Sequence, residues 1–281
     1  MTRVAVLTDS ASDLTASEAA QSGISVVPLL VSFGDREFQA GVDISLEEFW
    51  RELTAPNAPF PKTAAAAPGT FRDAFEQLFA DGADEVVYVG VSDKLSATLQ
   101  SARVARDMLP ERKIHIVDSA SASMGQGLLA QLAVERAAAE VSGTDIASEL
   151  SRRAKQLRLY VVLETLEYLK RGGRISGAQA AIGSVLSVKP IISIEHGVVE
   201  TADKPRTHGK ARRRLLELLT GVKAERVAVL HAQAPGVELF ADELAAATGV
   251  ARADVSIHLV GSSVGPHIGP GAYGAVILPP G

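Results

Sequence analysis

Short apolar runs alternate with longer amphipathic stretches along the first half of the chain. Four runs are brief, β-branched and bounded by turn residues, as buried strands are: Val4–Leu7, Val26–Val31, Val86–Val91 and Ile114–Val117. Between and after them, apolar residues recur at helical spacing and predict helices over Glu47–Leu53, Thr70–Phe79, Ser96–Leu109 and Gly127–Val141. Strands separated by helices favour a parallel sheet covered on both faces, whose ligands bind beyond the carboxyl ends of the strands.

The second half has a different pattern, with a hairpin signal at its centre. The strands Lys189–Glu195 and Val198–Thr201 flank His196-Gly197, a two-residue turn. The other predicted strands are Leu159–Leu163, Val227–His231, Val255–Val260 and Tyr273–Leu278. The predicted helices are Glu164–Arg171, Gly177–Leu186 capped by Ser176, Lys210–Leu219 and Val237–Thr248.

These patterns predict an α/β protein with two domains. Residues 1–155 form an N-terminal domain with a mostly parallel sheet flanked by helices, and residues 156–281 form a smaller C-terminal α/β domain with the hairpin. A length of 281 residues agrees with about two domains.

The apolar fraction of 47% indicates a large core rather than a membrane span. The longest apolar stretches, Ile24–Phe33 and Leu159–Leu163, are far shorter than the roughly 20 residues that a spanning helix needs. The N-terminal strand is followed at once by Thr8-Asp9-Ser10, which is unlike a signal peptide. We therefore expect a cytoplasmic protein.

Charge and cysteine content exclude several classes of function. The chain has 28 basic and 33 acidic residues, a net charge of −5, which disfavours nucleic acid as a partner. It has no cysteine, which excludes thiol chemistry and Cys-ligated metals, and its six histidines lack metal-ligand spacing, so we expect no metal. The basic stretch Lys204–Arg214 has no interleaved aromatic residue and fits either a solvated helix face or a nearby anion site.

Two short motifs match known patterns without their context. Gly261–Gly265 fits the GxSxG of serine hydrolases, with Ser263 as nucleophile, but we expect no helix from the Pro- and Gly-rich Pro266–Gly271. No acidic residue after Asp254 completes the order serine, acid, histidine. Gly269–Gly274 fits GxGxxG, but only seven residues follow it, too few for the helix and acid of a dinucleotide site.

Six segments form a more specific pattern when they are taken together. In chain order they are Thr8–Leu14; Pro61-Lys62-Thr63 before Pro68–Phe71; Ser92–Ala102; Val117-Asp118-Ser119 with Gly125-Gln126-Gly127; Leu166–Ser176 running to Lys189-Pro190; and Gly265–Ala272. This order and spacing resembles the DegV family over essentially the whole chain. The most specific parts are Leu-Lys-Arg-Gly-Gly-Arg-Ile-Ser and the His-x-Gly-Pro-Gly ending.

The resemblance implies a protein that binds a long-chain fatty acid in a buried tunnel between or beneath two α/β domains. Some members of the family are the lipid-carrying subunit of a fatty acid kinase, whose separate ATP-binding subunit phosphorylates the carboxylate. The resemblance therefore implies no cofactor, no catalysis by this chain, a kinase partner and transient contact with membranes.

The family pattern also places candidate site residues. Its carboxylate-binding positions fall on Thr63 and Ser96, with Ser92 and Thr98 nearby, and its phosphate or head-group contacts fall on His267, Arg174, Arg206 and Lys204. This chain departs from the pattern at Ala64–Ala67, where the family has hydroxyl residues, and at Ala97, where it has glycine. Fewer hydroxyls are therefore available to the head group.

Each candidate also has a plain structural interpretation. Thr63 and Ser96 fit helix N-caps, Arg174 fits a C-cap, and His267 fits a partner for a buried carbonyl. We interpret Asp9, Ser10, Asp118 and Ser119 mainly as turn residues after strands. Two other functions stay open: a stand-alone hydrolase or transferase acting on a small acid, and a carrier or regulatory module for another apolar ligand without a kinase.

Overall fold

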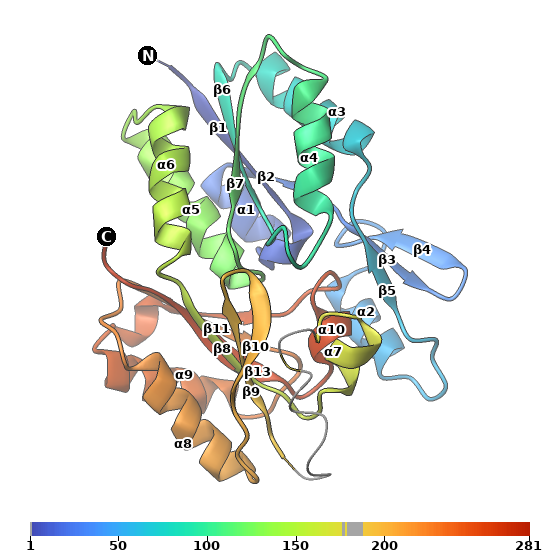
Figure 1. The fold of residues 1–281 in the computed structure, drawn as a ribbon, viewed down its shortest axis with the longest axis vertical. Helices are drawn as coiled ribbons and strands as arrows, with labels where there is room; N and C mark the ends of the chain where they lie inside the picture. The colour runs from blue at the N-terminus through green and yellow to red at the C-terminus, as the bar shows by residue number, and fades with distance from the viewer. Residues whose placement is uncertain (1, 176–177, 179–187) are drawn as a thin grey trace.

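Two β-sheets pack against one helix, α5 (Met124–Ala138), at the centre of the molecule (Figure 1). The structure is a computed structural model that describes residues 2–175, 178 and 188–281. Helix α5 contacts β1 and β6 of the first sheet and β11 and β13 of the second. Its inward residues, among them Leu128, Leu129 and Leu132, belong to a single buried apolar cluster that draws on both sheets.

The first sheet is parallel throughout, as the alternation of strands and helices predicted. Its order is β2-β1-β6-β7, with strands β1 (Val4–Asp9), β2 (Ile24–Val27), β6 (Glu85–Gly90) and β7 (Lys113–Asp118). One face is buried under α3 (Pro68–Ala80) and α4 (Thr98–Asp107). The other face is covered by α1 (Ala16–Ser22), α5 and α6 (Gly143–Ala154).

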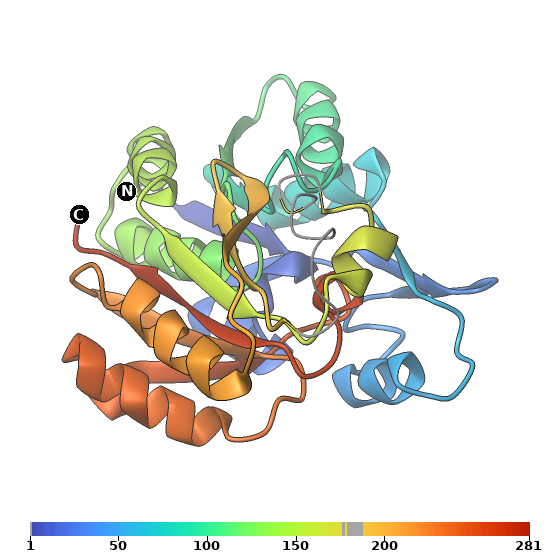
Figure 2. The same cartoon turned by 60° about the horizontal axis from the view of Figure 1, so that its bottom comes forward.

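The second sheet has six strands of mixed direction. Its order is β10-β9-β8-β13-β11-β12, with strands β8 (Arg158–Val162), β9 (Ile191–Glu195), β10 (Val198–Asp203), β11 (Arg226–His231), β12 (Val255–Leu259) and β13 (Tyr273–Leu278). Only the β11–β12 pair is parallel among these strands. Helices α8 (His208–Leu219) and α9 (Val237–Thr248) cover its outer face, and a 3-10 turn, Arg252–Asp254, precedes β12 (Figure 2).

A small antiparallel sheet, ordered β4-β3-β5, lies to one side of the two main sheets. Its strands are β3 (Leu30–Phe33), β4 (Arg36–Gln39) and β5 (Lys62–Ala64), and the β3–β4 hairpin projects from the body in both views (Figures 1 and 2). Helix α2 (Leu46–Leu53) begins with a capping box of Ser45 and Glu48 and packs Phe49 and Trp50 into the core.

The hairpin predicted at His196-Gly197 is confirmed. Strands β9 and β10 pair antiparallel with Glu195 opposite Val198, and both turn residues have positive φ, 51° and 83°. Two left-handed residues match the twist of the flanking strands, which is why a glycine follows the histidine here. The fold class is likewise the predicted α/β architecture with a parallel sheet and a hairpin-bearing second sheet.

One predicted strand is wrong. Val26–Val31 is not a single strand, because β2 ends at Val27 and β3 begins at Leu30. Pro28 separates them: proline has no N–H for a ladder and interrupts strand pairing. After this break the chain leaves the parallel sheet and forms β3 in the small sheet. Strand β3 pairs with β5, and this pairing positions Thr63 opposite Val31.

Other boundaries and elements also differ from the predictions. The sequence patterns missed α1, α6, β4 and β5, and α4 begins at Thr98 rather than Ser96. The predicted helix Gly177–Leu186 and its cap Ser176 lie outside the described residues. The predicted domain boundary falls between α6 and β8, and it stays a prediction. Among the described helices, none is long and apolar enough to cross a bilayer.

Trp50 ties α2 to the segment that follows β12, and its substitution tests how much this contact stabilises the fold. The indole is fully buried, and its Nε1–H donates to the Val260 carbonyl at 2.9 Å. Trp50→Phe leaves that carbonyl without its donor and leaves a small cavity, so we expect a loss of about 2 to 4 kcal/mol of unfolding free energy. Urea denaturation measures it. Phe38→Leu on the projecting hairpin is the control, and an equal loss there would contradict the assignment.

Candidate functional site

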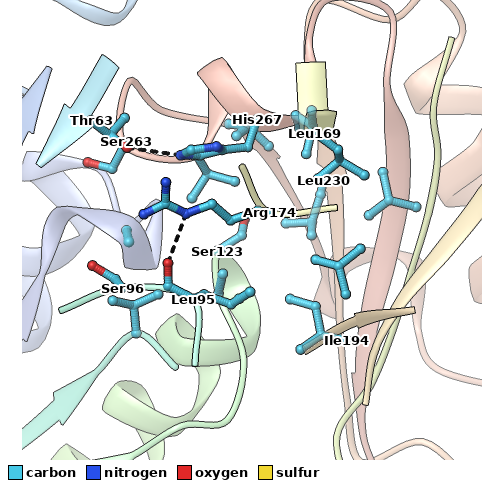
Figure 3. Close-up of a pocket in the computed structure, with 18 of the residues that line it drawn as sticks. Thr63, Leu95, Ser96, Ser123, Leu169, Arg174, Ile194, Leu230, Ser263 and His267 are labelled. Atoms are coloured by element: carbon cyan, nitrogen blue, oxygen red, sulfur yellow. Dashed lines mark hydrogen bonds between the residues drawn. The ribbon is translucent and has the colours of Figure 1, made fainter. Parts of the chain in front are cut away.

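An apolar cavity of about 300 Å³ lies where the carboxyl-terminal ends of the parallel strands approach the inner face of the second sheet. Most of its wall is aliphatic, with side chains from both sheets and from α7 (Glu167–Arg171): Leu29, Val91, Leu95, Leu159, Val161, Leu169, Ile192, Ile194, Val199, Leu230 and Val260. A few polar side chains gather at one side of it (Figure 3). A largely apolar pocket with few, grouped polar atoms is the usual form of a binding site for an amphipathic small molecule.

Thr63 and His267 meet at the polar side. Thr63 lies on β5 and His267 on the single-turn helix α10 (Gly265–Ile268), and Thr63 Oγ1 is 2.9 Å from His267 Nε2 (Figure 3). The two residues are 204 positions apart in the sequence, so the fold alone brings them together. The family resemblance implies both as site residues but gives no indication that they form a pair.

His267 is neutral at physiological pH. Burial, with a smaller contribution from the nearby Arg174 cation, lowers the pKa of its imidazole to about 4. The other ring nitrogen, Nδ1, has no partner among the described residues and lies against Gly172, where a β-carbon would be only 2.3 Å from it. Gly172 is therefore required by this close approach.

The surroundings of the imidazole decide which nitrogen carries its proton. An unpartnered N–H buried near the Arg174 cation costs more than an unpartnered lone pair. We therefore assign the proton to Nε2, which donates to Thr63 Oγ1. The Thr63 hydroxyl proton is then free to donate to a third group.

Arg174 lines the cavity while two of its N–H groups are held by the backbone. Nε donates to the Leu95 carbonyl at 3.0 Å, as Figure 3 shows, and Nη1 donates to the Gly172 carbonyl at 2.7 Å. The bond to Leu95 crosses from the loop after α7 to the loop after β6. Among the described residues the guanidinium has no carboxylate partner, so its charge is available to an anion in the cavity.

Only some of the predicted hydroxyls face this cavity. Ser96 lines it and pairs with Thr98 at 2.7 Å between their oxygens, while Thr98 is fully buried and does not line it. Ser92 is fully buried as well, and its hydroxyl donates to the Gly197 carbonyl at 2.8 Å. Ser92 and Thr98 therefore do not line the cavity, and their predicted contact with a carboxylate stays a prediction.

Lys204 and Arg206 lie outside the cavity wall. Both side chains are exposed on the segment between β10 and α8, and neither is among the lining residues. Their predicted contact with the head group stays a prediction. The basic residues near them are partly used in surface ion pairs, since Arg214 binds Asp203 and Glu217.

Several residues of the cavity wall were not predicted as site residues. Ser263 lines it and shares a hydrogen bond of 2.8 Å with Ser10, whose hydroxyl also accepts from the Leu29 N–H. Ser123 lines it and donates to the buried carboxylate of Asp13. Their positions just after strands were the available signal, since ligands of open sheets bind there.

The GxSxG match at Ser263 does not acquire a catalytic partner. A helix does follow it, α10, so the expectation that Pro266–Gly271 forms none is wrong; Pro266 fits the first turn of a helix, where no N–H is needed. Among the described residues, however, the only hydrogen-bond partner of the Ser263 hydroxyl is that of Ser10. A hydroxyl cannot serve as the base that a serine nucleophile needs.

The comparison with known proteins identifies the family. The model of the DegV family, described as uncharacterised proteins, matches residues 3–280. The chain belongs to the DegV family. DegV domain-containing proteins of Caldanaerobacter subterraneus and Streptomyces coelicolor are 35% and 34% identical to it, each match covering 98% of both chains.

Solved structures of DegV family proteins share this fold. A DegV family protein from Thermus thermophilus, described for its fatty acid binding, has a TM-score of 0.91 and 31% identity, with 99% of this chain and 100% of that chain covered. DegV from Bacillus subtilis, described as a fatty acid binding protein, has a TM-score of 0.84 and 30% identity, with 98% of each chain covered.

The described residues show no cluster of metal ligands. Within the described residues, no three or more His, Asp or Glu side chains converge on a point where one ion would bind. The polar side of the cavity instead offers hydroxyls, one neutral imidazole and one guanidinium, which suit an organic anion rather than a cation.

Asp13, which is hydrogen-bonded to the cavity residue Ser123, makes the stability of the fold depend on pH. Burial raises the pKa of its carboxyl from 3.8 to about 7, so between these values the folded chain holds a proton that the unfolded chain has lost. Asp13 therefore stabilises the fold less as the pH rises through this window. An asparagine at this position does not titrate, so the stability of Asp13→Asn should lack this fall. The difference in unfolding free energy, variant minus wild type, should therefore grow by about 1 kcal/mol per pH unit between pH 4.5 and 6.5, as measured by urea denaturation. A pH-independent difference would contradict this assignment.

Proposed function

We propose that this DegV family chain binds a long-chain fatty acid in the cavity and presents its carboxylate to a separate kinase subunit, which forms an acyl phosphate. The observation that carries the proposal is the combination of an aliphatic cavity with one polar side, formed by Thr63, Ser96, Arg174 and His267. The fatty acid binding described for the proteins of Thermus thermophilus and Bacillus subtilis supports it.

The aliphatic wall supplies the binding free energy. A saturated chain of about 14 methylenes gains up to roughly 11 kcal/mol on full burial, at about 0.8 kcal/mol per methylene. Association costs at least several kcal/mol, and the remainder still allows tight binding. Leu159, Val161, Ile192 and Leu230 are all buried, so they form the part of the cavity that suits the methyl end of the chain.

The polar side suits a carboxylate that must stay reactive. Thr63 and Ser96 offer hydroxyl donors, and the Nε2–H of His267 fixes the acceptor side of Thr63, so the threonine proton points to the carboxylate. Hydroxyl donors satisfy the anion without a bidentate ion pair, and its oxygen therefore keeps its nucleophilic character. Arg174 lies close enough to the same side of the cavity to receive the oxygens of an added phosphoryl group.

The position of the head group favours transfer to a partner. Thr63, Ser96, Arg174 and His267 are all partly exposed, whereas the aliphatic residues at the other end are buried. A fatty acid bound in this direction keeps its carboxylate near solvent and its chain inside the protein. We infer that the kinase approaches this side, and that the chain itself contributes binding and positioning rather than the phosphoryl donor.

Lipid analysis of the purified protein is the first test. After denaturation, mass spectrometry is expected to detect co-purified fatty acid, and delipidated protein is expected to bind palmitate or oleate again. The absence of both would overturn the proposal.

Thr63→Val removes the hydroxyl while keeping the shape of the side chain. We expect palmitate affinity to fall about tenfold or more, because a hydrogen bond to a charged group is lost, measured by isothermal titration calorimetry. Thr220→Val is the matched control, since the Thr220 hydroxyl caps α8 by bonding the Leu216 carbonyl, away from the cavity. Equal affinity in the wild type and Thr63→Val would show that Thr63 does not bind the carboxylate.

His267→Ala separates binding from phosphorylation. It removes the donor that orients Thr63 but leaves the aliphatic wall intact, so palmitate affinity should fall only several-fold. Acyl phosphate formation with the kinase subunit, identified by pull-down from the native host and followed by ATP consumption, should fall at least tenfold more than binding does. A loss of equal size in both assays would contradict a role of His267 in presentation.

A further inference from the structure

Ser123 has a backbone conformation that serines rarely adopt. It lies between strand β7 and helix α5, as the residue before the first helical position, with φ 55° and ψ −145°. This region of conformational space is nearly restricted to glycine, and residues other than glycine occupy it mainly at functional sites. The Ser123 N–H donates to the Ala11 carbonyl at 2.7 Å, which helps to hold the turn in place.

The residues around Ser123 have the pattern of a nucleophile elbow. In such an elbow, a serine at a sharp strand-to-helix turn is flanked two positions away on each side by small residues. Here these positions are Ser121 and Gly125, and a β-carbon on Gly125 would lie 2.1 Å from Ser121 Oγ. The turn is therefore tight enough to require glycine at this position. Ser263, in the GxSxG motif, has no such strained turn, since its φ is not positive.

Asp13 is placed to accept the proton of Ser123. Its Oδ2 accepts a hydrogen bond from Ser123 Oγ, and its Oδ1 accepts one from the Gly261 N–H at 2.9 Å, so the carboxyl group is held at both oxygens. Burial, with a smaller contribution from the charge of Asp9, raises the pKa of Asp13 to about 7. A general base is most effective when its pKa lies near the working pH.

A free backbone donor completes the arrangement. The Met124 N–H is the first of helix α5 and has no acceptor within the described part of the chain, whereas the N–H groups of Gly125, Gln126 and Gly127 bond to Ala122 and Ser123 carbonyls. In a nucleophile elbow, the N–H that follows the serine stabilises the oxyanion of the tetrahedral intermediate. Met124 occupies that position.

The elbow opens into the aliphatic cavity. Ala122 and Ser123 both belong to its wall, and Figure 3 shows Ser123 among the residues that surround it, together with Leu95 and Arg174. An acyl chain bound there meets the Ser123 side chain, whose hydroxyl is hydrogen-bonded to Asp13 and which the Met124 N–H follows in the chain. This clustering is independent of the Thr63–His267 pair.

We propose that Ser123 is a nucleophile and Asp13 its general base, acting on long-chain acyl thioesters, whose thiolate is a good leaving group. The inference rests on the proposed function, because the acyl chain must enter the cavity. Ser123 Oγ attacks the acyl carbonyl carbon and passes its proton to Asp13 Oδ2. The carbon–sulfur bond then breaks, and Asp13 gives this proton to the leaving thiolate. In the second step water attacks the serine ester and passes a proton to the Asp13 carboxylate, and Asp13 returns that proton to Ser123 Oγ, which releases the fatty acid and restores the hydroxyl.

Acylation by an activated ester tests the proposal on the whole chain. The probe is p-nitrophenyl decanoate, with p-nitrophenyl acetate for comparison, and the release of p-nitrophenolate and the acylated peptide are both measured. We expect decanoyl transfer to Ser123, identified by peptide mass spectrometry, and inhibition by prior loading with palmitate. Ser123→Ala should lower the rate of p-nitrophenolate release from the decanoate ester at least tenfold, and Asp13→Asn should lower this rate by about 100-fold at most.

Two further variants distinguish the loss of the nucleophile from a loss of folding. Ser123→Gly suits the strained backbone and must fold, yet lacks the nucleophile, so it should be as inactive as Ser123→Ala. Ser123→Cys keeps a nucleophile and should restore acylation. An unchanged rate in Ser123→Gly, or a label on another serine, would overturn the proposal.

Palmitate binding separates this proposal from the proposed function. If the wild type binds palmitate but transfers no decanoyl group to Ser123, the nucleophile is refuted and the carrier function stands. If the wild type binds no palmitate, the carrier function fails, and acylation of Ser123 by the acetate ester would then show a reactive serine without a lipid cavity.

Discussion

The shared burial of two sheet faces on helix α5 is the constraint on which the rest of the structure depends. One apolar cluster runs from the parallel sheet through α5 to the mixed sheet, so the two halves of the chain cannot be packed independently of each other. The cavity adjoins this cluster beyond the end of the parallel strands, and several of its wall residues, such as Leu159 and Leu230, belong to the cluster. It is thus a continuation of the core in which side chains stop short of filling the space.

The polar side of the cavity depends on contacts between segments far apart in the sequence. Thr63 comes from an edge strand, His267 from a single helical turn and Arg174 from the loop after α7, and backbone carbonyls hold the arginine. Each side chain is oriented by a neighbour that is itself fixed by packing. This explains how a protein with few polar groups in a large apolar cavity gives them definite orientations.

Much of the fold could be predicted from the sequence, and the parts that could not have physical reasons. Periodicity located the core strands and long helices because burial on one face imposes it, as in Val237–Thr248 and Tyr273–Leu278. It missed β5, because a three-residue edge strand has too few positions to show alternation.

For the site, the family motifs predicted Thr63, Ser96, Arg174 and His267, and all four line the cavity. The same motifs also included Ser92 and Thr98, and only the hydrogen bonds of the structure show where these two hydroxyls lie. The strained backbone of Ser123, with φ 55° and ψ −145°, arises from the tight turn around it, and the residue types in this segment do not predict it.

The bond between Ser92 and the Gly197 carbonyl has a consequence for how such proteins diverge. The β9–β10 hairpin is attached to the first half of the chain through a backbone atom, so its anchorage does not depend on which side chains the hairpin carries. Ile194 and Val199 of this hairpin reach the cavity wall. Exchange of hairpin side chains can therefore reshape that end of the cavity without loosening the scaffold.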